Sequence, residues 1–100
     1  QAATKGAIEI PLQVMQLSCD AMGVVRAMAE HGNPNSVSDA GVGALALRSA
    51  VLGAHLNVKI NATGIKDEAY RAGVLATAAE LAARVVREEA EVLAIVESKV

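Results

Sequence analysis

Five polar side chains gather in one short segment of the chain, namely Asn33, Asn35, Ser36, Ser38 and Asp39. Asparagine, serine and aspartate are common caps and turn formers, and that explanation requires no further function. The same side chains can also bind a substrate, and the dipole at the start of a helix favours an ionised carboxylate that can take part in proton transfer. This segment is therefore the best candidate for chemistry, with Asp39 as the candidate catalytic group.

A second polar group, Asn57, Lys59 and Asn61, lies near the end of an apolar stretch. Asn57 and Asn61 are four residues apart, so they share one face of a helix. Buried amide groups on such a face need hydrogen-bond partners. We therefore expect the two asparagines to lie in a binding cleft or to serve as caps. Lys59 is expected to face either solvent or an acidic group of a ligand.

Other kinds of site find little support. Metal binding requires several His, Cys or carboxylate ligands at suitable spacing, whereas His31, His55 and Cys19 stand alone. Gly41 and Gly43 fall inside a predicted helix and do not form a phosphate-binding loop. No pattern typical of a nucleophilic triad is present. We therefore expect no metal.

Composition narrows the class of protein. The 100 residues are 53% hydrophobic and carry a formal charge of −2, without a run of Lys or Arg that could neutralise nucleic-acid phosphates. The most apolar stretch, residues 40–60, is interrupted by polar and charged residues, which favours a buried helix over a membrane span. The single cysteine, Cys19, cannot form an internal disulfide, and this fits a reducing, cytoplasmic compartment.

Hydrophobic periodicity predicts an all-α chain of about three long helices. The first apolar pattern covers residues 2–31, but Pro11 either ends a short helix or kinks a long one. We expect the main helix to run from Pro11 to about His31. Gly32 then fits the left-handed position that follows many helices.

The second predicted helix runs roughly from Val37 to Ile60. Ser36 or Ser38 is expected to cap it, which places Asp39 at a helix N-terminus. Each glycine inside a helix costs about 1 kcal/mol relative to alanine, and close approach of neighbouring helices would offset that cost. We therefore expect this to be the central helix of the assembly. Its small residues are Gly41, Gly43, Ala44, Ala46, Ala50, Gly53 and Ala54.

A last helix is predicted to begin at Lys66-Asp67-Glu68 and to continue toward the chain end. Its apolar residues follow a four-three spacing that is typical of a seam between partner helices, interrupted by Glu89. Because the apolar side chains of the chain are mostly small, we expect the chain to be a dimer or larger. The seam comprises Leu75, Ala79, Ala82, Val86, Leu93, Val96 and Val100.

A family resemblance is carried by three elements of the sequence. They are Ile10-Pro11-Leu12, the run GNPNSVSDAGVGALALRSAVLGAHLNVKIN, and Ile65-Lys66-Asp67-Glu68 after it. The sequence resembles the C-terminal half of the folate-dependent cyclodeaminase family. That family includes the cyclodeaminase domain of formiminotransferase-cyclodeaminase and the bacterial methenyltetrahydrofolate cyclohydrolases. Its proline- and glycine-rich Pro-Gly-Gly-Gly-Ser motif is absent here. The resemblance therefore implies that residues 1–100 are the C-terminal portion of a larger helical domain.

The resemblance implies a multihelical bundle around the small-residue helix, interleaved in a homodimer, which binds a tetrahydrofolate derivative as substrate. It implies either a cyclodeaminase, which converts 5-formiminotetrahydrofolate to 5,10-methenyltetrahydrofolate and ammonia, or a cyclohydrolase, which interconverts the 5,10-methenyl and 10-formyl forms. Asp39 would transfer a proton, stabilise the cationic product or anchor the pterin. The matching elements assign substrate binding to Asn33, Ser38, Asn57, Lys59 and Asn61. The alternative is a non-catalytic helical oligomerisation module, in which the polar turn is only a cap.

Overall fold

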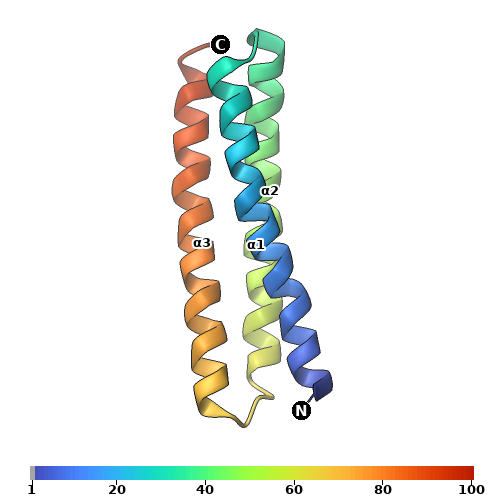
Figure 1. Cartoon of the computed structure of the whole chain (residues 1–100). Helices are drawn as coiled ribbons and strands as arrows, with labels where there is room; N and C mark the ends of the chain where they lie inside the picture. The colour runs from blue at the N-terminus through green and yellow to red at the C-terminus, as the bar shows by residue number, and fades with distance from the viewer. Residues whose placement is uncertain (1) are drawn as a thin grey trace.

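The computed structural model describes residues 2–100, and for residues 5–100 also the side chains. Three long helices, α1 (Ala2–His31), α2 (Pro34–Ala62) and α3 (Glu68–Glu97), lie side by side in an up-down-up bundle (Figure 1). The bundle is a rod of 50 × 18 × 16 Å. The prediction of an all-α chain with about three long helices is confirmed. Its interleaving with a second copy stays a prediction.

Helix α1 is continuous through Pro11, so it begins nine residues before the predicted start of the main helix. A proline lacks the N–H that would bond the carbonyl four residues earlier, here that of Ala7. The Nδ2 amide of Asn61 in α2 donates to this Ala7 oxygen at 3.2 Å. A side chain from a neighbouring helix thus satisfies the carbonyl that Pro11 leaves without its helical partner, and α1 need not end there.

The turn between α1 and α2 differs from its prediction in two ways. Gly32 does not have a positive φ, so it is not the left-handed residue expected after α1. A Cβ at Gly32 would lie 2.5 Å from the Met28 oxygen and 2.9 Å from the Ser36 Cβ, so glycine is needed for space. The N-cap of α2 is Asn33, whose Oδ1 accepts from the Ser36 N–H at 3.0 Å. Neither Ser36 nor Ser38 is the cap.

The third helix begins at an Asp67 cap, whose Oδ1 accepts from the Tyr70 N–H at 3.0 Å. At its other end the Lys99 ammonium donates to the carbonyl oxygens of Ala29 and Glu30, close to the end of α1. A cation at these terminal carbonyls is favoured by the dipole of α1. The end of the chain is thereby fastened to the α1–α2 turn.

The predicted seam of the last helix is wrong by one residue over most of its length. The buried residues of α3 are Val74, Ala78, Leu81, Val85, Glu89, Val92 and Val96. Of the predicted seam, Val86 is 40% exposed and only Val96 is buried. Both rows are apolar apart from Glu89, which lies in both, and neighbouring residues are only 100° apart around a helix, so the spacing alone does not decide which row is buried.

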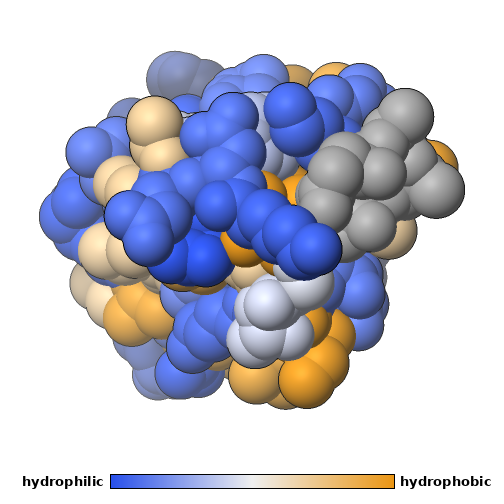
Figure 2. Space-filling view, turned by 90° about the horizontal axis from the view of Figure 1, so that it is seen from below, coloured by the Kyte–Doolittle hydropathy of each residue, from blue (hydrophilic) through white to orange (hydrophobic). Residues whose placement is uncertain are grey.

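Helix α2 is long and apolar enough, by length and composition alone, to cross a membrane. Core helices of soluble proteins pass the same test. Arg48 in the middle of α2 forms an ion pair with Glu89 of α3. The expectation that no helix spans a membrane stays a prediction. Figure 2, which looks along the rod from below, shows a mostly hydrophilic end with hydrophobic patches around its edge.

Candidate functional site

The polar segment, residues 33–39, forms the N-cap and the first two turns of α2, at one end of the rod. Because Pro34 occupies the first helical position, where its fixed φ suits a helix start, α2 begins three residues earlier than predicted. Asp39 consequently lies in the second turn, past the first-turn N–H groups, and the prediction of a carboxylate at the helix N-terminus is wrong. Asn33 serves as the cap, and Ser38 and Asp39 are exposed.

Asn57 and Asn61 lie at the opposite end of α2, where they line a groove between α1 and α2. The groove has a volume of about 480 Å³, a size in the range of small-molecule sites. Asn61 is held by its bond to the Ala7 carbonyl, while Asn57 is exposed at the groove. The remaining lining residues are apolar or small, namely Ala7, Ile10, Pro11, Val14, Ala50 and Ala54. Such a groove can hold a flat ring with polar edges.

Lys59 does not line this groove. It is two residues from either asparagine, and a separation of two residues turns a helix by about 200°. Its side chain is exposed. Beside it, burial lowers the pKa of His55 below its usual value, and the charge of Lys59 lowers it further. The structure therefore does not group Lys59 with Asn57 and Asn61 within one chain.

The two candidate groups are far apart. Asp39 and Asn57 are separated by 18 residues of the same helix, which corresponds to about 27 Å along its axis. One chain by itself therefore does not bring Asn33, Ser38 and Asp39 into one site with Asn57 and Asn61. Either only one group binds substrate, or a further chain or segment brings the two ends together.

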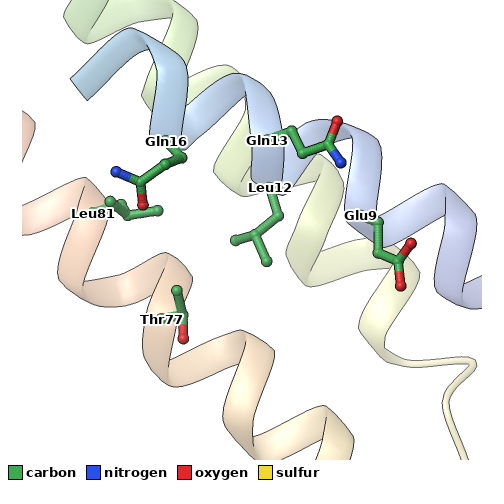
Figure 3. Close-up of a pocket in the computed structure, with 6 residues that line it drawn as sticks. All are labelled: Glu9, Leu12, Gln13, Gln16, Thr77 and Leu81. Carbon is green, nitrogen blue, oxygen red and sulfur yellow. The ribbon is translucent and has the colours of Figure 1, made fainter. Parts of the chain in front are cut away.

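A second groove, which the sequence analysis did not predict, lies between α1 and α3 (Figure 3). It has a volume of about 320 Å³. Glu9, Gln13 and Gln16 of α1 and Thr77 of α3 surround an apolar floor of Leu12 and Leu81. The signal in the sequence was the spacing of Glu9, Gln13 and Gln16, four and three residues apart, which forms one polar helix face.

Two further observations concern the reactivity of the Cys19 thiol and the binding of metal ions. Cys19 is buried, its thiol donates to the Leu81 oxygen at 3.5 Å, and burial raises its pKa while nearby Arg84 opposes the shift. Residues 2–100 contain no group of three or more His, Cys, Asp or Glu side chains placed to hold a metal ion.

Comparison with known proteins decides the family. The sequence model of the family described as formiminotransferase-cyclodeaminase matches residues 1–96. The chain belongs to this family. The resemblance inferred from the run at residues 32–61 is thereby confirmed.

Three relatives in this family illustrate the match. The formimidoyltransferase-cyclodeaminase of Dictyostelium discoideum is 43% identical over 68 residues, which are 68% of this chain and 13% of that protein. The methenyltetrahydrofolate cyclohydrolase of Methylorubrum extorquens is 37% identical over 70 residues, 70% of this chain and 34% of that protein. The formimidoyltransferase-cyclodeaminase of Gallus gallus is 32% identical over 99 residues, 99% of this chain and 18% of that protein. The matched part of the chain thus spans at most about a third of each relative.

Proposed function

We propose that this chain acts in folate one-carbon metabolism as part of a cyclodeaminase or a cyclohydrolase, with a tetrahydrofolate derivative as substrate. The names of the relatives and the family match support this proposal. The observation that carries it is the α1/α2 groove, in which two asparagines lie beside an apolar wall. A pterin is a flat ring with donors and acceptors at its edge, and an amide side chain offers both.

The two reactions make similar demands on the protein. In the cyclodeaminase reaction N10 of 5-formiminotetrahydrofolate attacks the formimino carbon and ammonia leaves. In the cyclohydrolase reaction water opens the 5,10-methenyl ring. Both pass through a tetrahedral carbon and require a proton to move at nitrogen or oxygen, a task suited to a carboxylate such as Asp39. Product analysis with each substrate separates the two activities.

The proposed state of the protein is a cytoplasmic homodimer or larger oligomer that binds neither nucleic acid nor membrane. Support comes from the buried thiol of Cys19, which suits a reducing compartment, and from the slight negative charge. Large apolar side chains along α1 are also exposed in the single chain, including Ile10 at 67% and Leu17 at 68%. Patches of this kind mark contact surfaces.

Titration of the purified chain with 5,10-methenyltetrahydrofolate tests the folate proposal. We expect micromolar binding, and the variant Asn57→Leu should raise Kd at least tenfold while leaving helicity unchanged. The matched variant Gln13→Leu changes an amide in the α1/α3 groove and should leave Kd within about twofold. The reverse result would assign the ligand to the α1/α3 groove. A folded protein that does not bind the ligand would favour the oligomerisation module.

A further inference from the structure

Pro11 lies in the interior of α1, and the helix continues through it. At this position another residue would donate its backbone N–H to the Ala7 carbonyl oxygen, four residues earlier. Proline has no N–H, and its ring presses against that carbonyl. The Ala7 oxygen is therefore open to a donor from outside α1.

Asn61 of α2 supplies this donor. Its Nδ2 atom lies 3.2 Å from the Ala7 oxygen, and the bond joins residues that are 54 positions apart in the chain. Because a carbonyl oxygen can only accept, the nitrogen end of the amide must face Ala7 and the Oδ1 end must face elsewhere. We name the bond between the Ala7 oxygen and Asn61 Nδ2 the Asn61 anchor. It fixes the orientation of a side chain whose two ends would otherwise be free to exchange places.

The Asn61 anchor lies in the α1/α2 groove, since Ala7, Pro11 and Asn61 all line that groove. Asn57, one turn earlier on the same face of α2, lines it too but is exposed, whereas Asn61 is half-buried. An exposed amide can turn either its donor or its acceptor toward a ligand. The groove thus contains one amide of fixed orientation and one that can adapt.

We propose that Pro11 is a positioning residue for this groove, because it leaves the Ala7 carbonyl free to hold Asn61. The anchored Asn61 presents its Oδ1 atom as an acceptor at a fixed place. The ligand that fits is a flat heterocycle with an N–H donor on the edge that meets Asn61. This assignment of the ligand edge rests on the proposed folate function, whereas the anchor itself rests on contacts within the chain.

An anchored side chain favours binding through entropy. A polar side chain that becomes ordered only when the ligand arrives loses rotamer freedom at that step. A side chain that is ordered beforehand avoids this loss, and the difference corresponds to about three- to tenfold in Kd. The role of Pro11 is therefore expected to be a moderate gain in affinity, transmitted through Asn61.

A purely structural role of the same bond makes a different prediction. If Asn61 only fastens the end of α2 to α1, the bond contributes to stability, and the orientation of the amide does not matter for the ligand. The variant Pro11→Ala separates the two roles. It gives residue 11 an N–H that can bond the Ala7 oxygen within α1, and it replaces a poor helix former with a good one.

NMR relaxation of the asparagine side chains tests the anchor. In the wild type the order parameter of the Asn61 NH₂ group should approach about 0.85, the value of a rigid group, and in Pro11→Ala it should fall below about 0.6. The exposed Asn57 supplies a flexible reference in each spectrum. A wild-type Asn61 as mobile as Asn57 overturns the anchor without any variant. An Asn61 that stays rigid in Pro11→Ala, so that both N–H groups share the Ala7 oxygen, overturns the role of Pro11.

Pro34 offers a matched control for the loss of a proline. It lies at the start of α2, where the first N–H groups of a helix have no carbonyl partner within the helix. Pro34→Ala therefore satisfies no free carbonyl and should leave the order parameter of Asn61 unchanged. Loosening of Asn61 in both proline variants would mean that the effect is not local to Pro11, and would overturn the proposal.

Urea unfolding provides a second test, without a ligand. Asn61→Leu removes the donor and should lower the urea midpoint in the wild-type background. In the Pro11→Ala background the decrease should be at most half as large, because the N–H of residue 11 then satisfies the Ala7 oxygen. Equal decreases in the two backgrounds overturn the link between Pro11 and Asn61.

Titration with 5,10-methenyltetrahydrofolate tests the positioning role. Pro11→Ala should raise Kd about three- to tenfold without lowering the urea midpoint, and Pro34→Ala should leave Kd within twofold. In an Asn61→Leu background Pro11→Ala should change Kd by less than twofold, because the residue through which Pro11 acts is gone. A full effect in that background would mean that the proline ring contacts the ligand itself, and would overturn the positioning role.

Two further outcomes separate this proposal from the folate function. A wild type that binds, together with an unchanged Kd in a Pro11→Ala variant whose Asn61 has become mobile, overturns the positioning role alone. A folded wild type that does not bind overturns the folate function, and the positioning role with it. The anchor is then decided by the order parameters of Asn61.

Discussion

Arg48 of α2 reaches Glu89 of α3, with 3.4 Å between Nη1 and Oε2. The Glu89 side chain is 9% exposed and that of Arg48 is 44% exposed, so the pair lies at the edge of the core with its acid inside. This contact explains how a carboxylate occupies the otherwise apolar buried row of α3.

The variant Arg48→Met should lower the free energy of unfolding by about 1–3 kcal/mol, because it leaves a buried carboxylate without its partner. Urea denaturation at fixed protein concentration measures the change. The matched variant is Arg26→Met, which removes a shorter but more exposed pair, 2.8 Å from Glu91 with both side chains 44% exposed. The free energy of unfolding of Arg26→Met should decrease by less than about 1 kcal/mol. Equal losses for the two variants would mean that burial does not determine the strength of these pairs.

Two glycines of the first half of the chain should respond to alanine with opposite signs. Gly32→Ala puts a Cβ against the Met28 oxygen and the Ser36 Cβ, and we expect a loss of about 1–3 kcal/mol from overpacking. Gly23 lies inside α1 with open space, so Gly23→Ala should gain up to about 1 kcal/mol from helix propensity. Thermal unfolding followed by circular dichroism compares the two. A stabilised Gly32→Ala would mean that the turn moves easily.

The Cys19 thiol should be protected in the folded chain. Its side chain is fully buried, and burial raises its pKa, which reduces the fraction of reactive thiolate. We expect iodoacetamide at pH 8 to react at least 100-fold more slowly with the native chain than with the urea-unfolded chain, since reaction requires opening of the bundle. Mass spectrometry over time gives both rates. Native and unfolded rates within tenfold of each other would show that the α1/α3 contact opens readily.

The free energy of unfolding should decrease below neutral pH, because His55 becomes protonated more readily in the unfolded chain than in the folded chain. Burial, and to a lesser degree the charge of Lys59, lowers the pKa of His55 below its usual value of about 6.5. The unfolded chain then binds more protons than the folded chain in this range, so stability that is present above pH 6.5 is lost as the pH falls through the folded-state pKa. Urea midpoints from pH 8 to pH 5 should decrease more for the wild type than for His55→Gln. Parallel curves would contradict this role.

The sequence predicted helix type and number well, because the apolar periodicity is strong throughout. The prediction from sequence was wrong where a contact from another helix offsets a local conformational preference of the chain. Pro11 predicts a break or kink, but the amide of Asn61, 50 residues later in the chain, bonds the Ala7 carbonyl and α1 continues. In α3 two apolar rows one residue apart have nearly the same spacing, and which of them is buried depends on how α1 and α2 pack against α3.

The candidate site was predicted in part. The shared face of Asn57 and Asn61 follows from their spacing, and both line one groove. The start of α2 was predicted wrongly, since either Asn33 or a serine could cap and the proline at the first position decided between them. The distance between the two ends of α2 follows from helix length alone.

The prediction with the greatest consequence concerns Asp39. Since Asn33 is the cap and Asp39 is an exposed residue of the second turn, Asp39→Asn should change the free energy of unfolding by less than about 0.5 kcal/mol. A role in chemistry predicts a much larger effect of Asp39→Asn on the proposed folate activity. Loss of turnover with folate binding retained would assign Asp39 to proton transfer or to stabilisation of the cationic product. Loss of binding would assign it to the pterin edge, which a carboxylate can bond with both oxygens. Turnover and Kd both within about threefold of wild type, a difference below roughly 1 kcal/mol, would leave the carboxylate without a catalytic or binding role.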